Sequence, residues 1–465
     1  MLLLCLTESA RLADLTTSVR SLRLRTDLYR INERYLTLKC YTSGFFLYRN
    51  GVFMKRLLTV IMLLSLMMIG CQKHSPIVYS VNKSDELIQY ESESIEESRF
   101  MESLEEQIKI EESESAAIEQ AAVWTKKVPD KPPVKVKGVY ISSKVAGAEK
   151  MKTIVEHIDA TEINAVVIDI LEDKGHIEYK MGGELIDSIG SVQETIPDID
   201  ALMSMLKEHN IYAIARIVTF RDPFLEQVKP EWLNHNNDGT VFHDASGMTW
   251  INPYNREAWE YKVQVAEQCA DAGFDEIQFD YVRFCTEKGM NNVTYTDEET
   301  QGMDKTEIIT EFIKFASDRL ADKNVFMSAD VFGTIIGSYV DTISVGQDYP
   351  VMASAVDYMC PMIYPSHYGN GNFGLDVPDR HPYEAILGAC NASKKDLLLE
   401  EVEGVHQAKV RPWLQGFTAS YLSSYLHYGP EEIRQEIQAV YDAGYDEWLI
   451  WNANNEYQWD AFLPA

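Results

Sequence analysis

Eight short runs rich in apolar and β-branched residues alternate with helix-forming stretches across the last two-thirds of the chain. Apolar residues recur at helical spacing between the runs, which indicates amphipathic helices packed on a sheet. Strand–helix alternation favours parallel strands, and eight strands in about 330 residues predict an α/β fold, a (β/α)8 TIM barrel over residues 136–465. We expect strands at Val136–Ser142, Ala165–Ile170, Tyr212–Phe220, Glu276–Phe284, Val325–Phe332, Asp357–Pro365, Arg411–Thr418 and Asp446–Ala453.

The helical patterns support this order, but no helical pattern follows the last strand. Gly273 and Gly444 directly follow two such patterns, as C-terminal caps do. Only about a dozen residues follow the last strand, too few for an eighth helix, so residues 101–123 are a candidate to complete the barrel. A doubly wound open sheet is the alternative, although no GxGxxG or phosphate-binding loop follows the first strand. The clearest helical patterns are Glu149–Thr161, Ile199–His209, Glu257–Ala272 and Thr306–Asp322.

A basic and then apolar segment near the N-terminus is typical of an export signal. The apolar or small residues of Leu57–Ile69 number 13, fewer than the roughly 20 that span a bilayer. They follow Met54-Lys-Arg and end in Met68-Ile-Gly-Cys71, which resembles a bacterial lipobox. Residues 54–71 are therefore predicted to be a lipoprotein signal peptide, with lipidation at Cys71 and the protein on the extracellular face of the cytoplasmic membrane. A buried helix ending in a free cysteine is the alternative.

Composition separates the remaining N-terminal residues from the barrel. Residues 1–53 show no sustained period and are interpreted as an upstream extension that is not native to the protein. Residues 72–135 are acidic and of low complexity, which predicts a solvated linker. The formal net charge of −30 disfavours nucleic acid as a partner and leaves the lipid anchor as the expected contact with the membrane.

The cysteines and histidines give no metal-binding pattern. No CxxC or Cys/His cluster with metal-ligand spacing occurs, so we expect neither metal nor cofactor. Cys269 lies in a helical pattern and Cys360 in a strand pattern, and both are expected to be small buried hydrophobic residues.

Two aspartates are placed at the ends of neighbouring strands. Alternation along the fourth strand points Asp280 into the barrel and Phe279 and Tyr281 towards the helices. Asp330 ends the fifth strand, and paired strands lie about 4.8 Å apart. Barrels carry active sites at these strand ends, and glycosidic bond hydrolysis needs one carboxyl as acid and another as nucleophile or base. The alternative is that one of the two is a structural ion-pair partner.

Other polar and aromatic groups at the strand ends favour a sugar pocket. Rings stack on the C–H face of a sugar, and amides bind its hydroxyls. An internal salt bridge between Asp169 and Arg216 explains those two residues equally well. The candidate substrate-binding residues are Asp169, Arg216, Asp222, Arg283, Tyr364, His367, Gln415, Trp451 and Asn452.

Six sequence blocks between about residues 136 and 460 are distinctive in combination, and Phe279–Phe284 is the most specific of them. The others are Lys137–Ser142, Asn164–Asp169, Ala215–Phe220, Trp250–Pro253 and Pro361–Pro365. Together they resemble a bacterial family described as a "putative glycosyl hydrolase domain", formerly a domain of unknown function. The resemblance implies a glycosidase-type (β/α)8 barrel that acts on a polysaccharide, with Asp280 as the leading catalytic residue.

Two positions depart from what the resemblance implies. In the related amylase-like barrels the fourth-strand aspartate is the nucleophile and a fifth-strand glutamate is the acid, whereas the fifth strand here carries Asp330. The shorter side chain must lie closer to the bond that it protonates. Cys285 stands where the family often has proline, a difference that we interpret as structural.

The first hypothesis is therefore a surface-anchored glycoside hydrolase of an extracellular or cell-wall polysaccharide, with Asp280 as nucleophile or base and Asp330 as acid. The second is a lipoprotein barrel that binds a glycan without catalysis. A metal-dependent deacetylase or lyase is a third, and it needs a ligand cluster that the sequence does not display.

Overall fold

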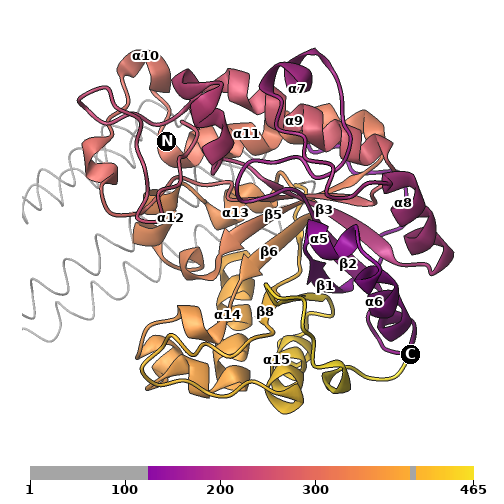
Figure 1. The fold of residues 1–465 in the computed structure, drawn as a ribbon. Coiled ribbons are helices and arrows are strands. Elements are labelled where there is room, and N and C mark those ends of the chain that lie inside the picture. Colours follow the sequence, from indigo (N-terminus) through magenta and orange to yellow (C-terminus); the bar gives the residue numbers. More distant parts are fainter. Residues whose placement is uncertain (1–123, 398–404) are drawn as a thin grey trace, which may run out of the picture. The chain divides into compact units, whose positions relative to one another are not determined.

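The computed structural model describes residues 124–397 and 405–465, and these contain a closed barrel (Figure 1). All strand pairs are parallel in the order β5-β4-β3-β2-β1-β9-β8-β6-β7, and a pairing of β5 with β6 closes the sheet. Because β7 and β8 are two pieces of one barrel position, the fold is the predicted (β/α)8 barrel. The strands are β1 (Lys137–Ile141), β2 (Ala165–Leu171), β3 (Tyr212–Val218), β4 (Glu276–Asp280), β5 (Phe326–Phe332), β6 (Tyr358–Met362), β7 (Lys409–Val410), β8 (Trp413–Gln415) and β9 (Trp448–Trp451).

Helices surround this sheet (Figure 1), and several of them begin at polar capping residues. Asp304, for example, accepts hydrogen bonds from two backbone N–H groups of α11, while Glu307 accepts one from the backbone of Asp304. Gly273 and Gly444 follow α9 and α15 with φ of +100° and +83°, as their capping role requires. The helices are α5 (Ser143–Ala146), α6 (Lys150–Asp159), α7 (Glu184–Ile189), α8 (Ile199–Glu208), α9 (Arg256–Asp271), α10 (Asp297–Thr300), α11 (Lys305–Leu320), α12 (Tyr339–Val345), α13 (Tyr349–Ala353), α14 (Pro382–Leu397) and α15 (Pro430–Asp442).

The strands are buried on both faces, as expected for a barrel enclosed by helices. All seven residues of β2 and of β3 are buried. Side chains such as Val166 and Ile217 pack against the helices in the main hydrophobic cluster. Tyr140, Tyr358 and Trp413 belong to a second cluster inside the barrel. The strand faces therefore separate an apolar outer layer from an interior that also carries polar groups.

Two strands depart most from the sequence prediction. The fourth strand ends at Asp280 rather than Phe284, because Tyr281 has a left-handed φ of +51° that breaks the extended backbone. The seventh strand is split around Arg411 and Pro412, since proline has no N–H to donate to a neighbouring strand.

The C-terminal tail lies where an eighth helix would begin. Within the described residues, only a 3-10 turn (η10, Trp459–Ala461) follows β9. The Trp459 ring stacks on His157 of α6 at 4.6 Å, and Pro464 forms a bridge with Thr161. The C-terminus accordingly lies beside α6 (Figure 1). Residues 101–123, the candidate for completing the barrel, lie outside the described residues.

Buried ion pairs fill the end of the barrel where the strands begin. Arg411 lies 2.8 Å from Glu276 and 2.9 Å from Glu447, and all three side chains are almost completely buried. Lys126 reaches this end from the segment before β1 and pairs with Asp357 at 3.0 Å. These charges are therefore occupied in holding strand ends together.

The lipid anchor stays a prediction, whereas the structure describes the two cysteines that were expected to be buried. No helix among residues 124–397 and 405–465 is long and apolar enough to cross a membrane. Leu57–Ile69 and Cys71 lie outside the described residues. Cys269 on α9 and Cys360 on β6 are fully buried free thiols, which confirms their expected packing role.

Candidate active site

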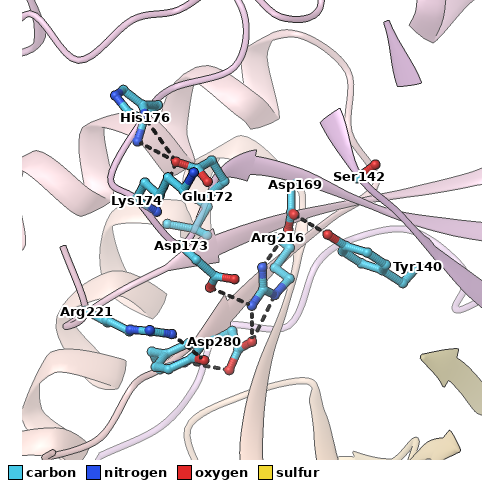
Figure 2. A network of polar contacts seen from close by, with 12 residues as sticks. Tyr140, Ser142, Asp169, Glu172, Asp173, Lys174, His176, Arg216, Arg221 and Asp280 are labelled. Carbon is cyan, nitrogen blue, oxygen red and sulfur yellow. Dashed lines mark hydrogen bonds and ion pairs between the residues drawn. The ribbon is translucent and has the colours of Figure 1, made fainter. Parts of the chain in front are cut away.

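Arg216 on β3 is the centre of a buried charge network at the carboxyl ends of the strands (Figure 2). Its guanidinium donates to Asp169 at 2.6 Å, to Asp280 at 2.9 and 2.6 Å, and to Asp173 at 3.4 Å. The Tyr140 hydroxyl donates to the other oxygen of Asp169. Burial, partly offset by the charge of Arg216, raises the pKa of Asp169 to about 6. The predicted salt bridge between Asp169 and Arg216 is therefore present, but it is shared with Asp280.

Asp280 is fixed at the last position of β4. Its Oδ2 accepts both hydrogen bonds from Arg216, and its Oδ1 accepts the backbone N–H of Tyr281 at 2.6 Å. The backbone carbonyl of Asp280 accepts from Thr219 on the neighbouring chain segment. This carboxylate therefore has a single orientation set by two neighbouring strands.

Asp330 is level with Asp280 on the adjacent strand, because Phe279 pairs with Ala329 in the register of β4 and β5. Its side chain is buried, and its Oδ1 accepts the indole N–H of Trp413 at 2.7 Å. Burial, reinforced by the negative charge of Asp280, raises the pKa of Asp330 well above its ordinary value. The two aspartates thus have different environments: Asp280 is in an ion pair, whereas Asp330 is buried with no ion-pair partner among residues 124–397 and 405–465.

Both aspartates line one pocket of about 220 Å3. The pocket wall is largely aromatic. The rings of Trp413 and Trp451 meet edge to face with their centres 5.7 Å apart, and those of Tyr364 and His367 do so with their centres 4.9 Å apart. Burial lowers the pKa of His367, which favours its neutral ring. The lining residues are Asp173, Arg216, Asp280, Tyr281, Arg283, Asp330, Phe332, Met362, Tyr364, His367, Trp413 and Trp451.

Of the eleven candidate catalytic and substrate-binding residues, seven line this pocket and four do not. Asp169 lies behind Arg216. Asp222 instead forms a fully buried ion pair of 2.6 Å with Lys262 of α9. Gln415 is buried and hydrogen-bonded to Asp379, and Asn452 donates to the backbone carbonyls of Gly416 and Glu456.

Five lining residues were not selected as site residues from the sequence: Asp173, Tyr281, Phe332, Met362 and Trp413. Tyr281 was expected to face the helices, and that expectation is wrong because its left-handed φ reverses the alternation after Asp280. Trp413 could have been found, since it lies two residues before Gln415 and strand residues at that spacing share a face. Asp173 lies in the loop after β2, where no periodicity indicates direction.

A metal site does not emerge from the described part of the chain, where no three His, Cys, Asp or Glu side chains are grouped to hold an ion. The pocket carboxylates are instead paired with Arg216 or with an indole N–H.

A closed parallel barrel with a polar pocket at the carboxyl ends of its strands defines a (β/α)8-barrel protein with its site where such folds carry active sites. The chain belongs to the family described as "putative glycosyl hydrolase domain", whose sequence profile matches residues 138–457. The resemblance inferred from the sequence is thus confirmed.

Solved structures with similar folds include a hypothetical protein from Ruminiclostridium thermocellum. It is 34% identical, with 42% of this chain and 97% of that chain covered and a TM-score of 0.38. The PgaB (BpsB) glycoside hydrolase domain from Bordetella bronchiseptica is 11% identical, with 69% of this chain and 94% of that chain covered and a TM-score of 0.49. The spore cortex-lytic enzyme SleL from Bacillus megaterium is 11% identical, with 74% and 80% covered and a TM-score of 0.42. No curated protein matches the chain.

Proposed function

We propose that this protein is a glycoside hydrolase that cleaves a polysaccharide by a two-carboxylate mechanism. The observation that carries the proposal is the pair Asp280 and Asp330, which lie level with each other near the carboxyl ends of adjacent strands and line one pocket in different electrostatic environments. Hydrolysis of a glycosidic bond needs such a difference, since one carboxyl must hold a proton while the other is anionic. Membership of the glycosyl hydrolase-type family supports the same assignment.

Asp330 acts as the general acid. Its raised pKa favours the protonated form that can donate a proton, and Trp413 occupies its Oδ1 as a hydrogen-bond donor. The proton therefore resides on Oδ2, from which it passes to the glycosidic oxygen as the bond to the sugar breaks. The same burial that raises the pKa of Asp330 limits its contact with water, which would otherwise compete for this proton.

Asp280 acts on the anomeric carbon as the nucleophile, or activates a water molecule as the base. The guanidinium of Arg216 and the N–H of Tyr281 hold its carboxylate in place. Arg216 itself is anchored from the opposite side by Asp169, so movement of Asp280 would break several charge-assisted hydrogen bonds. Asp169 and Arg216 are accordingly positioning residues in this mechanism.

The aromatic wall suits a sugar ring. Trp451 and Tyr364 line the pocket beside both aspartates, and His367 adds a neutral ring with hydrogen-bonding nitrogens. Stacking of a sugar on such faces places the anomeric carbon near the carboxyls without requiring charge on the sugar.

We further propose that the enzyme works outside the cytoplasmic membrane, held there by a lipid on Cys71, on an extracellular or cell-wall polysaccharide. The apolar segment Leu57–Ile69 followed by Gly70 and Cys71 supports this location. Radioactive palmitate should label the wild-type protein in the membrane fraction, and a Cys71→Ser variant should lose the label. Equal labelling of both proteins would contradict the anchor.

The catalytic roles are tested by comparing two leaving groups. Reducing-end release from a polysaccharide panel first identifies the sugar that the enzyme cleaves, and glycosides of that sugar are made with p-nitrophenol and 2,4-dinitrophenol. Asp330→Asn should lose about 10²–10⁴-fold in turnover on polysaccharide and recover most of it on the dinitrophenyl glycoside, whose leaving group needs no proton. Asp280→Asn should stay inactive on both substrates, and the exposed Asp322→Asn should match the wild type on both.

An Asp330→Asn variant that loses as much turnover on the dinitrophenyl glycoside as on the polysaccharide would contradict the role of Asp330 as acid. Binding of glycans with no turnover by the wild type would instead favour the non-catalytic glycan-binding barrel.

A further inference from the structure

Arg283 is a pocket residue that the proposed mechanism leaves without a role. It follows the end of β4 by three residues, and its side chain lines the same pocket as Asp280 and Asp330. Burial lowers the pKa of its guanidinium from a high ordinary value. Its position therefore brings a cation next to any bound ligand.

The guanidinium of Arg283 has almost no polar partner within residues 124–397 and 405–465. One N–H donates to the backbone carbonyl of Phe284 at 2.9 Å, and no carboxylate there forms an ion pair with it. A guanidinium carries five N–H donors, so most of those of Arg283 are left for a ligand or for water in the pocket that the side chain lines. The two fully buried arginines behave differently: Arg216 and Arg411 are each paired with at least two carboxylates.

Aromatic rings hold Arg283 in place without neutralising it. The guanidinium carbon lies 4.3 Å from the ring centre of Phe332, 4.8 Å from that of Trp250 and 5.3 Å from that of Tyr281. Cation–π contacts of this kind stabilise the charge less than an anion in the same place would. The rings also restrict the rotamers of Arg283, so its planar fork is oriented before a ligand arrives.

We propose that Arg283 binds a carboxylate of the substrate, so that this enzyme acts on an acidic glycan such as one containing uronic acid residues. This inference rests on the proposed function and specifies its substrate class. A carboxylate accepts two parallel N–H bonds from one guanidinium, whereas a sugar hydroxyl supplies no counter-charge.

The remaining pocket charges are compatible with an acidic sugar. Asp280 and Asp173 are paired with Arg216, and burial raises the pKa of Asp330, which disfavours its anion. The chain as a whole carries a net charge of −30, but that repulsion is screened beyond about 8 Å at physiological ionic strength. Contact with Arg283 therefore decides whether the pocket prefers an acidic or a neutral sugar.

Binding of matched ligands tests the proposal without turnover. Oligosaccharides from polygalacturonate, alginate and hyaluronan are each compared with their carboxyl-reduced forms at 150 mM salt, by the fluorescence change of the pocket residues Trp413 and Trp451. The full chain carries Asp330→Asn, which stops the proposed hydrolysis, and every ligand is compared in this same background. At least one acidic ligand should bind about tenfold or more tightly than its reduced form.

The variants separate direct contact from general charge. Arg283→Gln should lower affinity for that acidic ligand about tenfold or more, with affinity for the reduced form changed less than about twofold. Arg283→Lys should be intermediate, because it keeps the charge and loses the fork. Arg221→Gln is the matched control, since Arg221 also stacks on Tyr281, at 5.1 Å, but does not line the pocket.

Three results would overturn the proposal. They are reduced ligands that bind as tightly as every acidic one, a preference that survives Arg283→Gln, and a preference that Arg221→Gln abolishes equally. Hydrolysis of a neutral glycan with no affinity for any acidic ligand would overturn this inference and leave the proposed function intact. Acid-selective binding with no hydrolysis of any glycan by the wild type would overturn the proposed function and leave the role of Arg283 in binding intact.

Discussion

Replacing Glu436 with glutamine should make the stability of this protein less dependent on pH. Glu436 on α15 is fully buried, accepts the backbone N–H of Gln415 at 2.8 Å and accepts the Tyr428 hydroxyl at 2.7 Å. Burial raises its pKa to about 8 from an ordinary value of 4.5. The group therefore fixes β8, which carries Trp413 into the pocket, while remaining protonated at neutral pH.

The size of the effect follows from linkage. A raised folded-state pKa gives stability that is fully present below about pH 4.5 and is lost as the pH rises towards 8. Each pH unit between these limits costs about 1.4 kcal/mol, which amounts to about 3 kcal/mol at pH 7. Glutamine does not titrate, so the free energy of unfolding of Glu436→Gln lacks this dependence on pH.

Urea unfolding of the wild type and Glu436→Gln at pH 5, 6 and 7 measures the difference directly. The free energy of unfolding of the variant should gain on that of the wild type by about 1.4 kcal/mol for each pH unit, whatever constant offset the amide introduces. The exposed Glu431→Gln on the same helix should show no such trend. A difference between Glu436→Gln and the wild type that stays constant from pH 5 to 7 would refute the reasoning.

Three further outcomes follow from the site. Lys262→Met leaves the buried Asp222 carboxylate unpaired, so urea unfolding should show a loss of about 3–5 kcal/mol while turnover per folded molecule stays unchanged; full stability would contradict the structural role of the pair. Turnover should fall as the pH rises through the raised pKa of Asp330, because only the protonated acid donates; a pH–rate profile that climbs steadily above neutrality would count against it. Trp413→Phe removes a hydrogen bond that favours the anion of Asp330, so the alkaline limb of that profile should move to higher pH, and a move to lower pH would be the wrong sign.

Periodicity predicted the parts of the site that lie on regular strands. Asp280, Asp330 and Arg216 project into the barrel because side chains alternate along a strand, and parallel strands bring their carboxyl ends to one place. The eight strand positions followed from the same alternation between strand and helix.

Residues beyond the strand ends could not be placed in this way. Asp222 follows the third strand closely in sequence, yet the loop directs it to Lys262 on α9, away from the pocket. Tyr281 follows Asp280 directly and turns into the pocket through one left-handed φ angle. Asp173 reaches Arg216 from a loop. Backbone angles and distant ion pairs fix these positions, and neither leaves a periodic signal in the sequence.

The central claim is that Asp280 and Asp330 together hydrolyse a glycosidic bond. The most direct measurement is reducing-end release by the wild type and Asp280→Asn from a panel of neutral and acidic polysaccharides, with thermal unfolding confirming that both are folded. We predict release by the wild type on at least one glycan and less than about one hundredth of that rate for Asp280→Asn. Equal rates for the two folded proteins, or no release by the wild type from any glycan, would contradict the claim.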